Sequence, residues 1–410
     1  MGLLKKTDYY LHERGLLPTL KLIAVYGWDV LRQLFFRAAA RLCVRLRRSE
    51  LERRLGGRRV FVFTPSVEWH YLYQRAQQMA CRYAQLDNAA AVFLTTQRHY
   101  DNVLGFCEIR PNVFLLNVHE CGILRRLSPP VAELIACVYN VTTGTECLPA
   151  LSPDRLVYEY VDDLRFIVSK ADDFEHYAQE HRRLLQTADV AIATASALYE
   201  EILPVAKHPL LLPNAGDYAH FSKQGTQRSE IAEKCRGSRC VLGYYGALAS
   251  WFDYAAVKQS ALHHPDWTWL LIGRVIGDDL ERSGIAGLPN VLLVPAVPYE
   301  SLPDYIASCD LLTIPFLLND TTRSTSPVKL FEYMAAGKGI LTSDMPECRK
   351  YASVAIYHDP PELERQVEEL LRKRNDPAFR ALLEKEAREN TWESRVQTVL
   401  QELDRRAEEK

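Results

Sequence analysis

The sequence predicts an α/β protein built from two similar halves, each with a parallel sheet covered by helices on both faces. Short apolar runs alternate with helical stretches between residues 60 and 357, as in strands joined by crossover helices. The alternation occurs twice, and the polar, glycine-containing stretch from Gly216 to Arg239 separates the two halves. The length of 410 residues also exceeds the usual size of one hydrophobic core. We therefore expect two domains and an N-terminal extension.

Each half is expected to supply the strands of one sheet. The strands predicted in the first half are Val60–Phe63, Ala90–Thr95, Val113–Val118, Leu156–Tyr160 and Val190–Thr194. Those predicted in the second half are Val241–Tyr245, Trp267–Ile272, Val291–Val294, Leu311–Pro315, Gly339–Thr342 and Val354–Tyr357. Helices are predicted at Tyr71–Leu86, Tyr254–His263, Tyr299–Ser308, Pro361–Lys373, Pro377–Glu389 and Trp392–Arg406.

Basic residues concentrate near the N-terminus. Residues 1–59 hold 14 Lys and Arg against 5 Asp and Glu, and the rest of the chain carries a net charge of −11. The stretch from Trp28 to Arg48 has a helical pattern with a basic face and an apolar face. The basic face comprises Arg37, Arg41, Arg45 and Arg48, and the apolar face comprises Trp28, Leu31, Phe35, Leu42 and Leu46.

Such a helix suits the surface of an anionic bilayer, so we expect residues 16–48 to bind a membrane surface. Packing of the helix on the body or on another subunit is the alternative. No uncharged apolar run approaches 18 residues, so no membrane span is expected. Nucleic acid is not an expected partner, because the body is acidic and phosphate binding requires a continuous basic face. The ten cysteines lack metal-ligand or redox spacing, which favours reduced thiols in a cytoplasmic protein.

The stretch from Cys309 to Glu347 carries the strongest functional signal. It has the pattern of a buried strand, a polar loop, a short helix and a second buried strand. Ser326 is expected to cap the helix, with Pro327 at the first helical position. A helix start just after a strand's carboxyl end is where open α/β sheets bind anions. We therefore expect Lys329 to meet a phosphate and Glu332 to bind sugar or ribose hydroxyls; an ordinary helix without a ligand is the alternative.

The segment SPVKLFEYMAAGK, residues 326–338, resembles the C-terminal signature of family 4, group 1 glycosyltransferases. These are retaining enzymes of the GT-B fold, in which two Rossmann-like domains face each other across a cleft. The resemblance implies that Glu332 binds the ribose of a donor nucleotide. The family's second glutamate, which reaches the transferred sugar, is replaced here by Ser324. Sugar contacts are therefore expected from the preceding loop, with Asn319 as a candidate.

Residues 243–253, GYYGALASWFD, resemble a second stretch of these enzymes. A glycine at position 246 lets the backbone approach a diphosphate closely, although a tight turn would explain Gly246 equally well. Many relatives carry an arginine and a lysine in this loop, and this chain has neither. Neutralisation of the leaving diphosphate is therefore expected from Arg323, Lys329 or Arg274.

Residues 68–80, EWHYLYQRAQQMA, resemble a stretch that follows the first strand in this family. Trp69 is expected either to stack on a sugar ring or to anchor the loop. His70 is expected either to act as a catalytic group or to be structural. Gln74 and Arg75 are expected to contact the acceptor or the phosphates of the donor.

Residues 158–163, YEYVDD, resemble a further stretch of the first domain. Asp162 and Asp163 are expected to accept hydrogen bonds or to cap a helix on the acceptor side. The resemblance also implies the domain plan. Residues 1–58 form the basic extension, 59–215 the acceptor domain and 216–390 the nucleotide-sugar domain, and the helix at 391–410 crosses back onto the first domain.

Together, these features predict a hexosyltransferase that moves a sugar, with retention, from a nucleotide-sugar to a glycan or lipid-linked saccharide. No metal or other cofactor is expected, as the resemblance implies. Cell-envelope or exopolysaccharide biosynthesis at the inner face of the cell membrane would suit the basic helix. A catalytically inactive binding or scaffold protein is one alternative, and a nucleotide-sugar epimerase is another. A Rossmann dehydrogenase is disfavoured, because no strand leads into a G-x-G-x-x-G turn.

Overall fold

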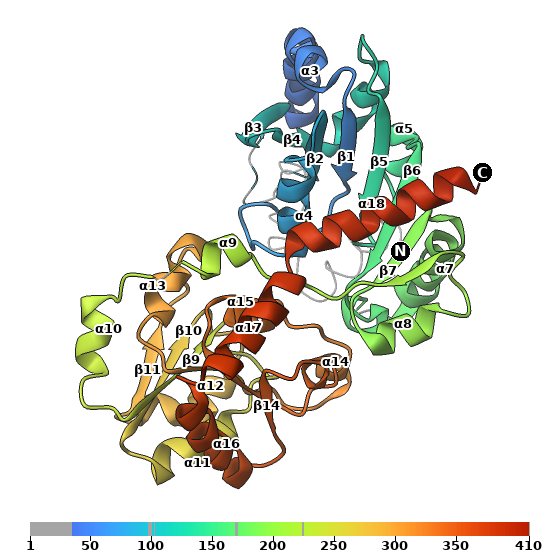
Figure 1. Cartoon of the computed structure of the whole chain (residues 1–410). Helices are drawn as coiled ribbons and strands as arrows, with labels where there is room; N and C mark the ends of the chain where they lie inside the picture. The colour runs from blue at the N-terminus through green and yellow to red at the C-terminus, as the bar shows by residue number, and fades with distance from the viewer. Residues whose placement is uncertain (1–34, 97–100, 102, 169–170, 224, 410) are drawn as a thin grey trace, which may run out of the picture.

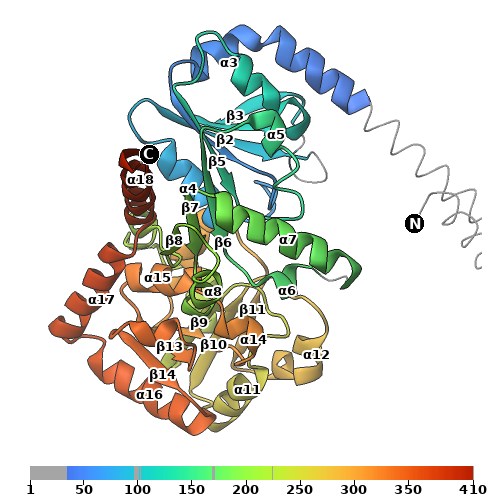
Figure 2. The same ribbon diagram turned by 90° about the vertical axis from the view of Figure 1, so that its right-hand side faces the viewer.

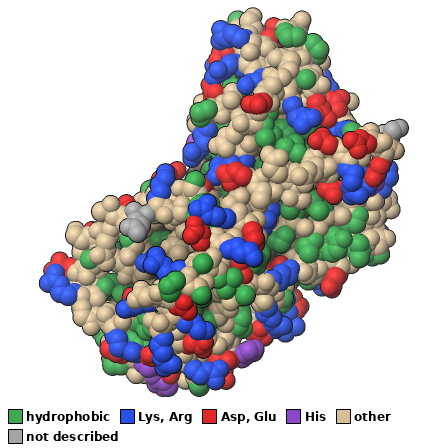
Figure 3. All heavy atoms as spheres, viewed as in Figure 1, with side chains coloured by type: hydrophobic (Ala, Val, Ile, Leu, Met, Phe, Trp, Pro, Cys, Tyr) green, Lys and Arg blue, Asp and Glu red, His purple; other side chains and the backbone are tan. Residues whose placement is uncertain are grey.

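The computed structural model describes residues 35–409 apart from 97–100, 102, 169–170 and 224. It contains two sheets, each in its own domain, and the domains meet along a waist (Figure 1). The surface between the two lobes is hollowed, and charges of both signs are scattered over this face (Figure 3). The two-sheet α/β architecture confirms the fold class predicted from the sequence.

The first domain is built on an eight-stranded sheet with the order β3-β4-β2-β1-β5-β6-β7-β8. Its strands are β1 Arg59–Phe63, β2 Ala89–Thr95, β3 Phe106–Arg110, β4 Val113–Asn117, β5 Glu133–Val138, β6 Arg155–Tyr160, β7 Val190–Ala193 and β8 Pro209–Leu211. Only β3 runs antiparallel to its neighbour. The central strands are buried on both faces, which explains their continuous apolar runs.

The second domain has a six-stranded sheet with the order β11-β10-β9-β12-β13-β14, and each pair of neighbours is parallel. Its strands are β9 Cys240–Tyr245, β10 Trp267–Ile272, β11 Val291–Val294, β12 Leu311–Ile314, β13 Gly339–Ser343 and β14 Val354–Tyr357. All six agree with the prediction to within one residue at each end. The sequence order reverses at β9, so the carboxyl ends of β9 and β12 meet where such sheets bind ligands.

Helices cover both sheets. In the first domain they are α3 Arg48–Leu55, α4 Arg75–Tyr83, α5 Leu148–Leu151, α6 Leu164–Ile167, α7 Ala171–Thr187 and α8 Ser196–Ile202, with the 3-10 helix η1 Val118–Arg126. Those of the linker and second domain are α9 Tyr218–Phe221, α10 Ser229–Lys234, α11 Tyr254–His263, α12 Asp279–Ser283, α13 Leu302–Ile306, α14 Asp320–Arg323, α15 Val328–Ala335, α16 Pro360–Lys373 and α17 Pro377–Glu389, with η2 Ile285–Gly287, η3 Tyr299–Ser301 and η4 Cys348–Lys350.

The last helix, α18 Trp392–Glu408, crosses back onto the first domain and lies against α4 (Figure 1). Trp392 is completely buried, and it joins Val396, Val399 and Leu403 in the core beneath β1 and β2. The first domain therefore uses both an early segment and the end of the chain.

Residues 35–46 form a helix that runs along the outer end of the first domain, away from the second domain (Figure 2). Its inward face consists of the small side chains Ala40 and Val44, which are buried. The large apolar side chains Phe35, Leu42 and Leu46 are 70%, 58% and 77% exposed. The helix therefore packs on the body and still presents an apolar ridge to solvent. Most of the predicted membrane-binding segment, residues 16–34, lies outside the described residues, and none of the described helices is long and apolar enough to span a membrane.

Candidate functional site

Two glycine turns meet at the carboxyl edge of the second sheet. Gly246 follows β9 with φ of 141°, and Gly273 follows β10 with φ of 154°. A Cβ atom on Gly273 would lie 1.8 Å from the carbonyl oxygen of Gly246. Both turns therefore require glycine, and their backbones form a compact floor beside the cleft.

Lys329, in the first turn of α15, faces this floor. Its Nζ atom would lie 3.3 Å from a Cβ atom on Gly246. It also lies 5.5 Å and 5.1 Å from the ring centroids of Tyr244 and Phe316, within the range of cation–π attraction. Burial lowers the pKa of Lys329 to about 8. Within the part of the chain that the structure describes, Lys329 has no salt-bridge partner, so its charge is available to an anion. The phosphate contact of Lys329 stays a prediction.

Glu332 lies one turn further along α15 and is only 3% exposed. The hydroxyl of Tyr245 donates to one of its oxygens at 2.6 Å, and the hydroxyl of Tyr299 donates to the other at 3.0 Å. Burial raises the pKa of Glu332 to about 7. The predicted ribose contact is therefore closed off in this structure, and a ribose could reach the carboxylate only if Tyr299 moved.

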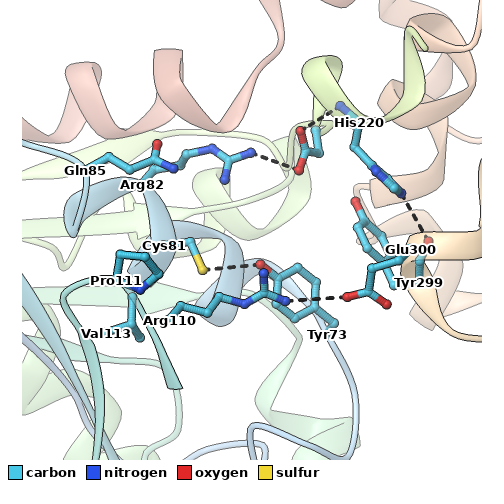
Figure 4. A pocket seen from close by; sticks show the side chains of 11 residues that line it. Tyr73, Cys81, Arg82, Gln85, Arg110, Pro111, Val113, His220, Tyr299 and Glu300 are labelled. Atoms are coloured by element: carbon cyan, nitrogen blue, oxygen red, sulfur yellow. Dashed lines mark hydrogen bonds and ion pairs between the residues drawn. The ribbon is translucent and has the colours of Figure 1, made fainter. Parts of the chain in front are cut away.

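Tyr299 connects Glu332 to the first domain. Its hydroxyl also accepts a hydrogen bond from Gln78 at 3.0 Å, and its ring lies 5.2 Å from that of Tyr73. The same residue lines an interdomain cavity of about 260 Å³, in which Arg110 points at Glu300 across the domain boundary (Figure 4). A change in the angle between the domains would therefore alter the contacts of Tyr299, which is one of the two hydrogen-bond donors to Glu332.

The start of α15 differs from the prediction. Pro327 occupies the N-cap position, and no side chain caps the helix. Ser326 is buried, and its hydroxyl accepts a hydrogen bond from the backbone of Asn214 at 3.2 Å, while the Asn214 amide donates to the Ser326 carbonyl at 2.6 Å. The expectation that Ser326 caps the helix is therefore wrong. Ser326 instead joins α15 to the exit of the first domain.

Several polar side chains of the segment before α15 form hydrogen bonds within that segment. Asn319 caps α14 by accepting from the backbone N–H of Thr322 at 3.0 Å. Ser324, at the position of the missing glutamate, donates to carbonyls within α14. Arg323 is exposed and lines a cavity of about 200 Å³ with Asp163 and other residues of the first domain. Arg323 thus faces the cleft, whereas the side chain of Asn319 is engaged locally.

On the opposite wall of the cleft, His70 is held by Asp101. The Nδ1 atom of His70 lies 2.7 Å from an Asp101 oxygen, and the Asp101 carboxylate also accepts from the backbone N–H groups of Trp69 and His70 at 2.6 and 3.1 Å. The carboxylate is buried, while His70 is 54% exposed. An imidazole oriented by a buried carboxylate keeps its other nitrogen free to accept or donate a proton. Sequence reasoning missed Asp101, because no motif surrounds it.

Trp69 and Arg75 have structural surroundings. Trp69 is 6% exposed and packs edge-on against Phe93, which supports the anchoring alternative over sugar stacking. Arg75 is buried in an ion pair with Glu159 at 2.5 Å and donates to the carbonyl of Pro213 at 3.1 Å. Neither side chain reaches the cleft, because each is enclosed by the core of the first domain.

The other predicted site residues are Gln74, Asp162 and Asp163 of the first domain and Arg274 of the second. Gln74 is exposed and is the N-cap residue of α4. Asp163 caps α6 by accepting from the backbone of Arg165 at 2.9 Å. Asp162 has solvent-exposed area, yet the protein crowded around it raises the pKa of its carboxyl group. Arg274 donates to the Tyr71 hydroxyl at 3.1 Å across the cleft. No group of three or more His, Cys, Asp or Glu among the described residues is placed to hold a metal ion.

The second domain matches a known family. Residues 239–373 match the family described as Glycosyl transferases group 1. The second domain is therefore similar to group 1 glycosyltransferases. A curated relative, named as a teichuronic acid biosynthesis glycosyltransferase, TuaH of Bacillus subtilis strain 168, is 26% identical over 295 residues, which cover 65% of this chain and 73% of TuaH. The similarity to TuaH extends the glycosyltransferase resemblance beyond the matched domain, since it covers more of the chain.

Solved structures with the same fold include glycosyltransferases of the GT-B fold. Sucrose-phosphate synthase from Thermosynechococcus elongatus has a TM-score of 0.60 at 14% identity and covers 84% of this chain and 98% of its own. HepE of Anabaena, in complex with UDP and glucose, has a TM-score of 0.58 at 14% identity and covers 85% of this chain and 99% of its own. These similarities confirm the predicted GT-B fold.

Proposed function

We propose that the protein is a glycosyltransferase that moves a hexosyl group from a nucleotide-sugar to a glycan or lipid-linked saccharide. One observation carries the proposal: Lys329, a half-buried cation with no salt-bridge partner among the described residues, faces the glycine floor at Gly246. Two relatives of the fold support the donor class, since HepE was solved with UDP-glucose and a trehalose-6-phosphate protein of E. coli with UDP-2-fluoro glucose.

The donor diphosphate would lie between the Gly246 turn and Lys329, with the ribose towards Glu332. Backbone N–H groups and a partly desolvated cation stabilise the charge that develops on a departing diphosphate. Arg323 and Arg274 extend the positive charge at the cleft and would neutralise the remainder. We propose that no metal takes part, and that configuration is retained, with the departing phosphate accepting the proton of the acceptor hydroxyl.

The acceptor would approach from the first domain. His70, oriented by Asp101, is the residue best placed to hold a sugar hydroxyl, and the exposed Gln74 and Asp162 of the same domain would add polar contacts. Domain closure would exclude the water that otherwise hydrolyses the donor. Trp69 and Arg75 would shape this wall from behind rather than touch the acceptor.

We propose that the acceptor belongs to a cell-envelope polysaccharide pathway, which the name of TuaH supports. The exposed ridge of Phe35, Leu42 and Leu46 beside exposed arginines supports placement on an anionic membrane surface. A lipid-linked saccharide at the inner face of the cell membrane would then be within reach of the cleft.

The experiment is a thermal-shift panel of UDP-, GDP- and dTDP-sugars and their free nucleotides, without added metal. A ligand that binds only the folded state raises the melting temperature. One nucleotide family should stabilise the protein. Glu332→Gln should weaken the binding of that nucleotide by about 10-fold or more, since a hydrogen bond to a charged group is worth about 1.5–3 kcal/mol. Glu281→Gln, an exposed change in the same domain, is the matched control and should bind normally.

The two failures of this panel have different meanings. A well-folded sample with no shift for any nucleotide would favour the inactive binding or scaffold alternative. Normal affinity in Glu332→Gln would remove Glu332 from the site while leaving the donor class intact. A separate product assay tests the epimerase alternative, which predicts conversion of the donor sugar in the absence of an acceptor.

A further inference from the structure

A second cavity opens at the opposite edge of the second sheet from the Gly246 turn. Its volume is about 580 Å³, within the range of small-molecule sites. Its walls come from the interdomain linker, α13, the segment between α15 and β13, and the first turn of α17. It shares no residue with the proposed donor site.

Four basic side chains line this cavity: Lys223, Lys338, Arg374 and Arg380. Asp310 is the one acidic residue in the lining, and it pairs with Arg374 at 3.0 Å. Lys338 donates to the carbonyl oxygen of Cys309 at 2.7 Å and keeps its positive charge unpaired. Among the described residues, the side chains of Lys223 and Arg380 have no hydrogen-bond or ion-pair partner. The cavity therefore holds three uncompensated positive charges.

The lining also has an apolar part. Phe379 is half-buried in the wall beside Arg380, and Pro303 lies across from the linker. Basic groups that converge beside an aromatic wall suit a ligand with an anionic end and a compact body. We propose that this cavity is a second ligand site, which binds a phosphorylated small molecule.

The position of the cavity adds weight to the proposal. It adjoins the linker and α17, which are the two segments that lead the chain between the domains. Phe221 of its lining contacts the rings of Tyr245 and Tyr299, at centroid distances of 6.1 and 5.6 Å, and the hydroxyls of these tyrosines hold Glu332. The site thus borders the donor helix from behind.

The test is calorimetric titration of the full chain with inorganic pyrophosphate in a Lys329→Ala background, which weakens phosphate binding at the donor site. We expect one pyrophosphate per chain, with an affinity that falls at least 10-fold in Lys223→Glu/Arg380→Glu. Arg236→Glu reverses the charge of one exposed residue of the same domain outside the cavity and should leave the affinity unchanged. Thermal melts confirm that each variant is folded, and Arg380→Ala serves as the milder variant.

Titrations with inorganic phosphate, glucose 6-phosphate and uridine monophosphate then show whether the site prefers a free phosphate, a sugar phosphate or a nucleotide. Absence of binding by every probe in the Lys329→Ala protein would overturn the proposal. Pyrophosphate binding that is the same in the cavity variants and in Arg236→Glu would also overturn it. Neither result bears on Glu332, so failure here is distinct from failure of the proposed donor site.

Discussion

Lys329 is half-buried and has no salt-bridge partner among the described residues, and the charge of Glu332 on the same helix only partly opposes the effect of burial on its pKa. Most buried charges in proteins are paired, because removing a charge from water is costly. Here the aromatic rings of Tyr244 and Phe316 compensate only in part, and the pKa falls to about 8. Under the proposed function, the diphosphate of the donor would add negative charge beside Lys329 and offset this cost.

The affinity for UDP should consequently depend on pH. Under the proposed function Lys329 would bind the diphosphate as a cation, and it loses its proton as the pH rises through about 8. Affinity should therefore fall by about 10-fold per pH unit well above the pKa, until the higher pKa of the bound state is reached. Glu332, with a pKa of about 7, is still partly protonated at the lower end of this range, so the Lys329 effect is assessed at the upper end. Calorimetric titrations with UDP from pH 7.5 to 9.5 would measure the decline.

Lys329→Arg is the matched control for that prediction. Arginine stays protonated throughout this range, so the variant should bind UDP with little pH dependence even if its absolute affinity is lower. A wild-type affinity that stays flat up to pH 9.5 would show that the charge of Lys329 does not contribute to binding.

Single residues also show where sequence reasoning reaches its limit. Lys329 and Gly246 lie in separate stretches, yet each was predicted because each follows a recognisable strand. The surroundings of Arg75 could not be predicted, since its partner Glu159 is 84 positions away. The same holds for Glu332, whose tyrosine partners come from the end of β9 and from η3. Local pattern places a residue on an element, but long-range packing decides what its side chain contacts.

The helix at 35–46 has one face packed on the first domain and one apolar face exposed to solvent. Ala40 and Val44 allow close packing on the first domain, so this helix is part of the body. Its outward ridge is large and apolar, which is unusual beside exposed arginines on a helix that is already packed. The two sequence-based alternatives, membrane binding and intramolecular packing, are therefore compatible, because they use different faces.

Replacing the ridge should release the protein from anionic vesicles. Full burial of one leucine is worth about 1.5–3 kcal/mol, so Leu42→Ser/Leu46→Ser should lower vesicle partitioning at least 10-fold. Co-sedimentation with vesicles of phosphatidylglycerol and phosphatidylcholine measures this partitioning. Leu203→Ser/Leu262→Ser alters two leucines that are comparably exposed on other surfaces, and should leave binding unchanged. Equal binding by both double variants would exclude the ridge as the membrane contact.

Elements with an unambiguous period were predicted well. α11 and α17 have the predicted bounds, and the strands of the second sheet agree closely. β3 and β8 were missed, since these edge strands are only partly buried and lack a continuous apolar run. β5 was also missed although its sequence is apolar. α4 begins at Arg75 rather than Tyr71, because Gln74 and Gln77 form a capping box there.

The two domains are joined by more than the linker and α18. At one end of the cleft, Arg274 bonds the Tyr71 hydroxyl across the gap. At another, the buried carboxylate of Glu347 accepts from the backbone N–H of Ser196 at 2.7 Å, and Lys350 donates to both the Ser196 hydroxyl and Glu347. The contacts lie where segments after strand ends of opposite domains meet. They hold the present separation of the domains.

Loss of the Glu347 contact should widen the cleft. A hydrogen bond to a charged group contributes about 1.5–3 kcal/mol, which is enough to shift an open–closed equilibrium by about 10-fold or more. Glu347→Ala/Lys350→Ala should therefore have a larger radius of gyration by small-angle X-ray scattering than the wild type in the absence of ligand. Glu369→Ala/Lys373→Ala removes an exposed ion pair within α16 and should scatter like the wild type.

The radius of gyration of the Glu347 variant and the wild type should also be compared with nucleotide bound. If closure assembles the site from both domains, saturating nucleotide should contract the Glu347 variant more than the wild type, because the variant starts from a more open ensemble. Since Tyr299 contacts both Gln78 of the first domain and Glu332 of α15, the open variant should also bind the nucleotide differently from the wild type. An unchanged radius and an unchanged affinity in the folded variant would show that the Glu347 contact neither sets the separation of the domains nor influences the donor helix.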